Sequence, residues 1–220
     1  MILAEKMSLK RCRVFENSEV APSVYYLKTE RTSDFIPGQM IRLTENIEAP
    51  PRLYSIASGI HDDFFGILYS VVKGGKLTPL LSGLKPGNKI FCSSAFGSYT
   101  DPAKETIWIA TGTGIAPFLS MVLSGMHSGK ALIRGARQKS DFYFDEIFEL
   151  KLKDRYVRCC SSGELKNSYH GRVTQYLSDH EVDKKSKYML CGSAEMVVDT
   201  RDILINKGVA FTQILSEIYF

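Results

Sequence analysis

Short apolar runs separated by turn-forming pairs make up the first hundred residues. The turns contain Pro37-Gly38, Gly74-Gly75 and Pro86-Gly87. The apolar runs are residues 24–27, 40–43, 64–72 and 89–92. Several short strands joined by tight turns are typical of a small antiparallel barrel. We therefore predict such a barrel for residues 1–100.

The pattern changes after Asp101-Pro102, where strand-like and helix-like segments begin to alternate. The strand-like segments are residues 106–110, 131–133, 156–160 and 187–191. The helix-like segments are residues 117–126, 142–152, 173–178 and 194–207. This alternation predicts an α/β domain over residues 101–220, with a parallel sheet that binds ligands at the carboxyl ends of its strands.

Composition and charge narrow the class of protein. The chain of 220 residues is 44% hydrophobic and 24% charged, which suffices for two domains with separate cores. No apolar stretch is long enough to cross a bilayer. Residues 1–15 carry charges where a signal peptide is apolar, so we expect a cytoplasmic protein without membrane contact.

The residue types argue against metal and nucleic-acid binding. The five cysteines are odd in number and include no C-x-x-C pair, which disfavours disulfides, zinc and iron–sulfur clusters. The net charge of +4 is mild and the basic residues are scattered, so we expect no nucleic-acid partner. A slightly basic surface suits an acidic protein partner.

Two stretches of the first half have the side chains to hold a phosphorylated, planar ligand. Arg52 can grip a phosphate, Tyr54 can lie flat on a ring, and Ser55 can hydrogen-bond the edge of that ring. An ordinary strand is the alternative. In residues 75–78, Gly-Lys-Leu-Thr, the glycine lets backbone amides approach an anion before a helix start, although a hairpin turn has the same composition.

Three further stretches lie in the second half. Residues 110–117, Ala-Thr-Gly-Thr-Gly-Ile-Ala-Pro, form a strand-to-helix turn typical of nucleotide pyrophosphate sites, although they match neither a Walker sequence nor G-x-G-x-x-G. Cys191 ends another strand and is either at the ligand edge or a small buried hydrophobe. Residues 217–220, Glu-Ile-Tyr-Phe, are either an exposed tail or a stacking surface for a flat ligand.

In this order, and over almost the whole chain, the five stretches resemble the ferredoxin–NADP reductase family, most closely its short bacterial branch that serves ferredoxin or flavodoxin. The resemblance implies an FAD-binding antiparallel Greek-key barrel followed by an NADP-binding α/β domain. It also implies a monomeric enzyme that transfers hydride between nicotinamide C4 and flavin N5. Single electrons would then pass between the flavin and an acidic carrier, ferredoxin or flavodoxin.

The resemblance also implies roles for individual residues. Ser55 and Glu217 would orient the flavin N5 region, Cys191 would pack beside the nicotinamide, and the ring of Tyr219 would cover the flavin until nicotinamide displaces it. The residues implied to bind FAD are Arg52, Leu53, Tyr54, Ser55, Leu68, Tyr69, Ser70, Val71, Lys76, Leu77, Thr78, Tyr219 and Phe220, the last stacking on adenine and favouring FAD over FMN. Those implied to bind NADP(H) are Thr113, Gly114, Arg137, Ser162, Arg172 and Met196.

The chain departs from this branch at one position that bears on the choice of nucleotide. Arg137 and Arg172 stand at two of three positions that carry arginine for the ribose 2′-phosphate, but Gly163 occupies the third. Lys139 or Lys166 can compensate for it. No acidic residue follows the second strand to hold an NAD ribose, since residues 135–138 are Gly-Ala-Arg-Gln, so we expect NADP(H) rather than NAD(H). The alternatives are an NADH-dependent reductase component of an oxygenase-type chain, a free-flavin reductase and a non-enzymatic flavoprotein.

Overall fold

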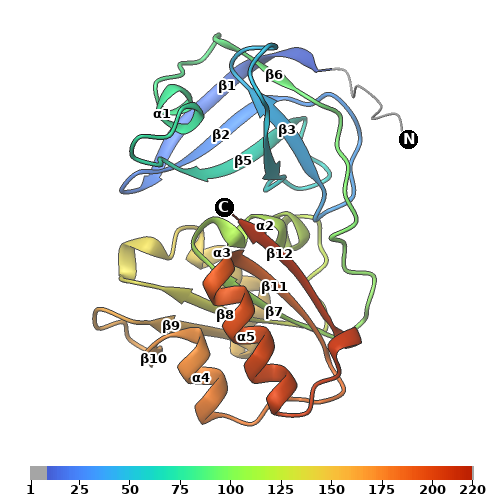
Figure 1. Ribbon diagram of the computed structural model, residues 1–220, viewed down its shortest axis with the longest axis vertical. Helices are drawn as coiled ribbons and strands as arrows, with labels where there is room; N and C mark the ends of the chain where they lie inside the picture. The colour runs from blue at the N-terminus through green and yellow to red at the C-terminus, as the bar shows by residue number, and fades with distance from the viewer. Residues whose placement is uncertain (1–8, 220) are drawn as a thin grey trace.

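Residues 9–219 are described by a computed structural model in which the chain forms two stacked lobes (Figure 1). The N-terminal lobe contains a six-stranded antiparallel sheet with the order β4-β3-β6-β1-β2-β5. Its elements are β1 (Lys10–Ala21), β2 (Val24–Glu30), β3 (Met40–Thr44), β4 (Arg52–Ser55), β5 (Phe64–Ser70), α1 (Leu77–Ser82) and β6 (Lys89–Cys92).

This sheet curls on itself without closing into a continuous ladder. Its edge strands are β4 and β5. Ile56, directly after β4, forms an isolated bridge with Ile67 of β5, and Ala57 N donates a hydrogen bond of 2.8 Å to Gly66 O. Alternate side chains of the strands point inward, as the pleat requires, and form an apolar core. The predicted antiparallel barrel is therefore confirmed, in a partly open form.

The C-terminal lobe contains a six-stranded sheet with the order β10-β9-β8-β7-β11-β12, in which every neighbouring pair is parallel. Its strands are β7 (Thr106–Thr111), β8 (Lys130–Ala136), β9 (Tyr156–Cys160), β10 (Tyr169–His170), β11 (Lys187–Ser193) and β12 (Ile214–Tyr219). Its helices are α2 (Ala116–Leu123), α3 (Asp145–Leu152), α4 (Val173–Asp179) and α5 (Ala194–Asn206). The predicted α/β fold is confirmed.

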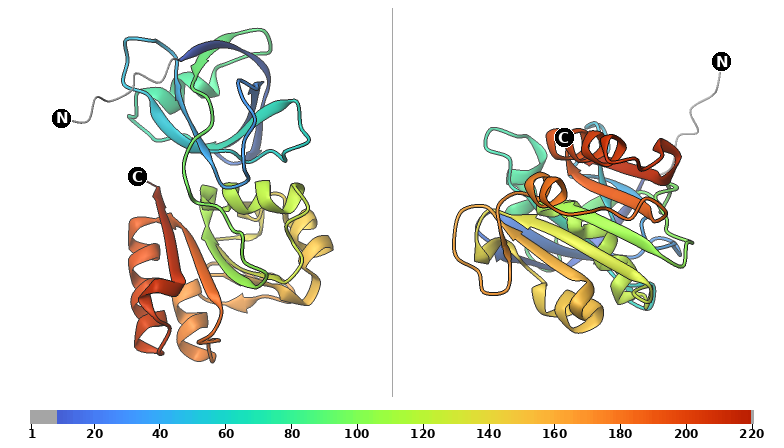
Figure 2. Two further views of the ribbon diagram at one scale, coloured as in Figure 1. Left: turned by 90° about the vertical axis from the view of Figure 1, so that its right-hand side faces the viewer. Right: turned by 90° about the horizontal axis from the view of Figure 1, so that it is seen from below.

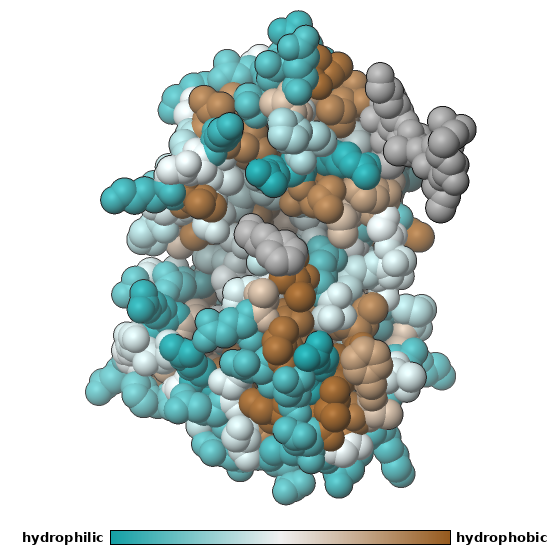
Figure 3. All heavy atoms as spheres, viewed as in Figure 1, coloured by the Kyte–Doolittle hydropathy of each residue, from teal (hydrophilic) through white to brown (hydrophobic). Residues whose placement is uncertain are grey.

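The helices cover both faces of this parallel sheet (Figure 2). α2 and α3 pack on the face that continues into the cluster shared with the other lobe, whereas α4 and α5 pack on the opposite face around a separate cluster. No helix within residues 9–219 is long and apolar enough to cross a membrane. The face seen in Figure 3 is mostly polar, with an apolar band over the part of the lower lobe where α5 and β12 lie.

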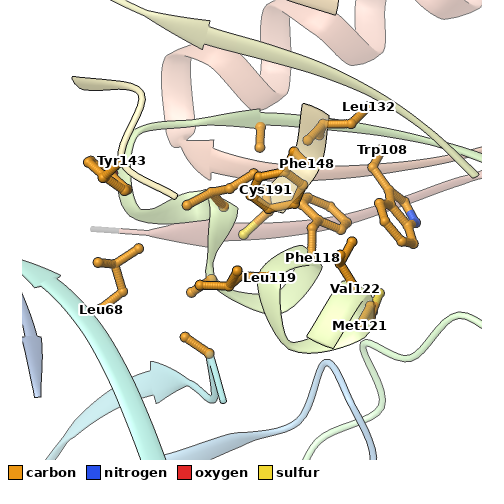
Figure 4. Close-up of a cluster of buried hydrophobic side chains, with 14 of the residues drawn as sticks. Leu68, Trp108, Phe118, Leu119, Met121, Val122, Leu132, Tyr143, Phe148 and Cys191 are labelled. Carbon is orange, nitrogen blue, oxygen red and sulfur yellow. The ribbon is translucent and has the colours of Figure 1, made fainter. Parts of the chain in front are cut away.

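α2 joins the two lobes. Its residues from Ala116 to Val122 are all buried, because the helix packs on the parallel sheet and against the barrel at once. Leu68 of β5 reaches the same cluster as Phe118 of α2 (Figure 4). Ser120 Oγ on α2 also donates a hydrogen bond of 2.7 Å to Ser58 O of the barrel. The lobes therefore share a continuous apolar core, which holds their strand ends in place.

Several element boundaries differ from those expected. The helix expected from residue 142 begins at Asp145, because Phe144 adopts a left-handed φ of 61°. The helix expected to reach residue 126 ends at Leu123, ahead of Gly125 with φ of 84°. Glu217 and Tyr219 belong to the edge strand β12 rather than to an exposed tail, and Phe220 lies outside the described residues.

Candidate functional site

A cavity of about 500 Å³ lies at the carboxyl ends of the parallel strands, where the C-terminal lobe faces the barrel. Val24 and Ser70 line it from the barrel side. The side chains from the C-terminal lobe that line it are Thr111, Thr113, Arg137, Asp141, Tyr143, Cys159, Ser161, Arg172, Val173, Thr174, Ser193, Glu195, Met196 and Asp199. Its position is the one at which open α/β sheets bind ligands.

The Thr-Gly-Thr-Gly turn forms one wall of this cavity. Gly112 has a positive φ of 54°, which turns the chain out of β7 and into the short 3₁₀ turn before α2. Gly114 is packed against β11 so closely that a Cβ atom would lie 2.3 Å from Cys191 O. The absence of a side chain therefore brings the turn onto the end of β11, with Thr113 left facing the cavity.

The positive side chains of the cavity follow the ends of two strands that are separated by β9 in the parallel sheet. Arg137 follows β8 and Arg172 follows β10, and both are exposed. The loop after β9 is tied to the loop after β8 by Ser162 N, which donates to Arg137 O over 2.8 Å. Ser161 lines the cavity, whereas the side chain of Ser162 is exposed outside its lining.

Gly163 leaves open space where the third arginine was expected. The nearest atom to a Cβ built there is Cys160 Sγ, at 3.9 Å. A side chain at this position would meet no obstruction, so the glycine is not required by packing. The cavity therefore has two arginines in its lining.

Ser55, Cys191, Glu217 and Tyr219 come together where β11 and β12 approach the barrel. Ser55 Oγ donates a hydrogen bond of 2.6 Å to Glu217 Oε1 from the other lobe. Cys191 is the register partner of Glu217, and Ser193 is that of Tyr219. Burial raises the pKa of Glu217, and burial followed by the Glu217 charge raises the pKa of the Cys191 thiol well above its usual value.

Two polar atoms of this cluster are unsatisfied. Glu217 Oε2 and Tyr219 Oη are buried and make no hydrogen bond of good geometry within residues 9–219, although the Tyr219 hydroxyl lies beside Ser55 and Cys191. Buried polar atoms are nearly always hydrogen-bonded, so each exception calls for an explanation. A ligand with a polar edge would supply the missing partners.

The residues expected to bind a planar ring lie on β4 and β5. Arg52 and Leu53 are exposed, while Tyr54 is half-buried with its ring edge-on to Tyr69 at 6.5 Å between centroids. Burial raises the pKa of Tyr54 to about 12. Leu68 is buried in the apolar core that the two lobes share, and Ser70 lines the cavity.

The segment with Lys76, Leu77 and Thr78 forms a turn followed by α1 rather than a hairpin. Thr78 Oγ1 accepts a hydrogen bond of 2.9 Å from Val72 N, and Leu77 is buried in the barrel core. Lys76 is exposed. Neither Lys76 nor Arg52 forms an ion pair with a described residue, so both cations are available to an anion.

The structure also adds cavity residues that the motifs did not indicate. Asp141, Tyr143, Glu195 and Asp199 line the cavity. Glu195 and Asp199 are four residues apart on α5, so helix periodicity after Ser193 was a usable signal for both. Asp141 ends a short 3₁₀ turn, Lys139–Asp141, in which its carboxylate accepts from Gln138 N over 3.1 Å, and Tyr143 lies in the segment between this turn and α3.

Comparisons with known proteins agree with this architecture. The oxidoreductase NAD-binding domain family matches residues 108–202. The flavodoxin/ferredoxin–NADP reductase of Buchnera aphidicola subsp. Baizongia pistaciae is 32% identical over 200 residues, which cover 79% of this chain and 80% of that protein. The flavodoxin/ferredoxin–NADP reductase of Escherichia coli is 30% identical over 193 residues, which cover 76% and 77%.

Solved structures show the same fold. A crystal structure of a ferredoxin NADP+ reductase from Neisseria gonorrhoeae with bound FAD and NADP has a TM-score of 0.87 at 22% identity, covering 96% of this chain and 99% of that one. A ferredoxin reductase in carbazole 1,9a-dioxygenase has a TM-score of 0.82 at 21% identity, covering 97% and 70%. Since an oxygenase-type reductase shares the fold, only the site residues can separate the two activities.

Proposed function

The chain belongs to the flavodoxin/ferredoxin–NADP reductase family, and from this premise we propose that it is an FAD-dependent enzyme that carries electrons between NADPH and ferredoxin or flavodoxin. The hydrogen bond between Ser55 and Glu217 is the observation that carries the proposal. It links the barrel to the end of the parallel sheet, next to Cys191 and the nucleotide-sized cavity. One lobe alone does not form this site.

We assign FAD binding to residues 1–100 and NADP(H) binding to residues 101–220. The boundary is supported by Asp101, whose carboxylate bonds to Thr106, Trp108 and Lys130 of the C-terminal lobe. Tyr99 Oη also donates to Leu190 O over 2.9 Å, so the connection between the lobes is anchored on the C-terminal side.

The residues present fit a flavin dinucleotide. Arg52 and Lys76 would hold its phosphates, because both are exposed and unpaired within the described chain. Tyr54 would stack on the ring, and the unsatisfied Glu217 Oε2 and Tyr219 Oη would meet its polar edge. Phe220, expected to stack on adenine, lies outside the described residues. When bound, the flavin supplies the hydride and one-electron chemistry that no side chain has.

NADP(H) fits the cavity better than NAD(H). Thr113 and the turn ended by Gly114 would hold the pyrophosphate, and Met196 would pack against the nucleotide. Arg137 and Arg172 would bind the 2′-phosphate, because guanidinium groups pair with phosphate in two-point geometry. The preference rests on two arginines, since Gly163 provides none.

Glu217 and Cys191 have distinct proposed tasks. The raised pKa of Glu217 favours its protonated form, so this carboxyl can hold a proton on Oε2 while Oε1 accepts from Ser55. The raised pKa of Cys191 keeps the thiol neutral, so it packs beside the reacting carbon and does not attack it. Tyr219, whose hydroxyl end is buried, excludes water from the cluster.

The electron acceptor is proposed to be an acidic carrier protein. The relatives cited above are named for flavodoxin and ferredoxin. The net charge of +4 on this chain would favour the approach of a negatively charged carrier.

Anaerobic stopped-flow reduction of the purified flavoprotein tests the proposal. We expect NADPH to bleach the flavin band faster than NADH at equal concentration, and the reduced enzyme then to pass electrons to added flavodoxin or ferredoxin. Faster bleaching by NADH would support the oxygenase-type alternative. Transfer to free flavin but not to either carrier would support a flavin reductase. Absence of bleaching by both nucleotides would refute the enzyme activity.

A further inference from the structure

The side chains that line the nucleotide cavity have a net negative charge, which is unexpected. Arg137 and Arg172 face it together with three carboxylates, those of Asp141, Glu195 and Asp199. At neutral pH the lining therefore carries one more negative than positive side chain. A cavity that selects a ligand for an extra phosphate normally offers an excess of cations there. Each of the three carboxylates must therefore either weaken the attraction of the two arginines for phosphate or lie too far from them to do so.

Glu195 is the carboxylate that acts on an arginine directly. Its Oε1 lies 3.7 Å from Arg172 Nη1. The two side chains are 78% and 72% exposed, so packing does not force them together and their charges are the main attraction. No other ion pair of Arg172 and none of Arg137, Asp141 or Asp199 occurs within residues 9–219.

The backbone fixes both partners of this pair beside the cavity. Ser193 caps α5 by accepting from Met196 N, which places Glu195 in the first turn of the helix. Arg172 N donates to Gln175 Oε1 over 2.9 Å at the start of α4. Because the Glu195 carboxylate already lies beside the Arg172 guanidinium, a phosphate that binds Arg172 has to displace that carboxylate or share the guanidinium with it.

We propose that Glu195 is a specificity-determining residue that lowers the preference of this enzyme for NADPH over NADH by occupying Arg172. The inference rests on the proposed function, since it concerns the nucleotide bound in the same cavity. A 2′-phosphate meets both the competition for Arg172 and the repulsion of a nearby like charge, whereas a neutral ribose meets neither. Gly163 increases the effect, because among the described residues of the lining Arg137 is then the one arginine without an ion pair.

Calorimetric titration of Glu195→Gln with adenosine 2′,5′-bisphosphate and with 5′-AMP tests this role. These probes lack nicotinamide, so their binding does not depend on the region of Tyr219. We expect the variant to bind the bisphosphate about fivefold to tenfold more tightly and AMP with less than about a twofold change, as expected for loss of one exposed ion pair and one repulsion. The gain should shrink as salt is added.

Asp199→Asn is the matched control, because it removes one negative charge from the same helix and the same cavity without releasing an arginine. We expect it to change the bisphosphate affinity much less than Glu195→Gln does. In an Arg172→Gln background, the gain from Glu195→Gln should disappear, which is the signature of coupling between the two residues.

The outcomes separate this inference from the proposed function. Equal gains in Glu195→Gln and Asp199→Asn, or a gain that persists without Arg172, would overturn the role of the ion pair. Probe binding that does not respond to Glu195→Gln would overturn it as well, with the proposed function intact. If no variant bound either probe, the nucleotide site itself would be refuted, and the inference with it.

Discussion

The two lobes differ in what they bury. Among the described residues of the barrel, the buried polar side chains are neutral hydroxyls: Thr29, Thr44, Ser55, Ser58 and Ser93. Those of the C-terminal lobe include three buried charged side chains, Asp101, Lys130 and Arg134. A buried charge is costly unless partners compensate for lost hydration. The comparison indicates that buried charges fix irregular segments of the chain. The barrel strands need no such charges, because backbone hydrogen bonds between neighbouring strands hold them together.

Asp101 holds the segment that connects the lobes. Its carboxylate accepts from Trp108 Nε1 and from Lys130 Nζ, each over 2.8 Å, and from Thr106 Oγ1 over 2.9 Å. All three partners lie on strands β7 and β8 of the parallel sheet. The connection is therefore fixed to the lower end of the sheet, opposite the cavity.

Arg134 fixes the segment before α3 that forms one wall of the cavity. Its guanidinium donates to Tyr143 O over 2.8 Å and to Asp141 O over 3.2 Å, on the loop before α3. It lies over the rings of Tyr143 and two phenylalanines, with centroids 4.8 to 5.9 Å away. In the described part of the chain no carboxylate pairs with it, and its Nε has no hydrogen-bond partner. Aromatic faces and backbone carbonyls thus take the place of a counter-ion.

The largest expected effect is that of Asp101→Ala. It removes the carboxylate that pairs with the buried Lys130 and leaves that ammonium with only Ala103 O and Thr106 Oγ1 as partners among the described residues, so we expect a loss of about 3–5 kcal/mol in the free energy of unfolding. Glu16→Gln is the control from the barrel, because it breaks the more exposed Lys28–Glu16 pair of 2.7 Å and should cost less than about 1 kcal/mol. Urea unfolding measures both, and equal losses would contradict the contrast between the lobes.

Arg134→Met should have the next largest effect. It leaves two backbone carbonyls without donors, so we expect a loss of about 2–3 kcal/mol together with weaker binding of adenosine 2′,5′-bisphosphate. Leu27→Ala in the barrel core should lose about 2–5 kcal/mol yet leave that affinity unchanged, because Leu27 belongs to the separate core of the barrel and does not line the nucleotide cavity. Urea unfolding and calorimetry on both variants distinguish a general loss of stability from a displacement of the segment with Asp141 and Tyr143. Unchanged affinity in Arg134→Met would show that the position of this segment does not depend on Arg134.

The smallest expected effect is a difference in pH dependence between two glutamates. Burial raises the pKa of Glu217, so the native state binds its proton more tightly, and stability should fall as the pH rises from 4.5 through the raised value. The pKa of Glu16 is lowered by hydrogen bonds from Lys28 and Ser18, so its contribution is instead lost as the pH falls below 4.5.

Urea unfolding between pH 4 and 7 measures these slopes. Glu217→Gln should remove the decline above pH 4.5, and Glu16→Gln should leave that decline in place. If the difference in the free energy of unfolding between the wild type and Glu217→Gln stayed constant from pH 4 to 7, the pKa of Glu217 would be the same in the folded and unfolded chains, which would contradict this prediction.

Local pattern was sufficient for much of the fold. Residues 89–92 and 156–160 were expected as strands and coincide with β6 and β9. The nucleotide turn follows β7 as expected, because Gly112 and Thr113 act through backbone conformation within a few residues. The helix at residue 142 was placed three residues early, since the left-handed Phe144 is stabilised by tertiary contacts such as its edge-on packing with Tyr26.

The sequence by itself determined the two kinds of sheet, their turns and the residue types available for phosphate and ring binding, because periodicity and turn chemistry are local. Only the tertiary structure decided which of those residues meet. The Ser55–Glu217 bond spans 162 positions, and the pairing of β12 with β11 that sets it up leaves no local pattern. The same holds for Arg134, which is buried without a counter-ion among the described residues, and for Glu195 beside Arg172. Three strands separate β10 from β11 in the sheet, and the packing of α4 against α5 brings the residues that follow them together.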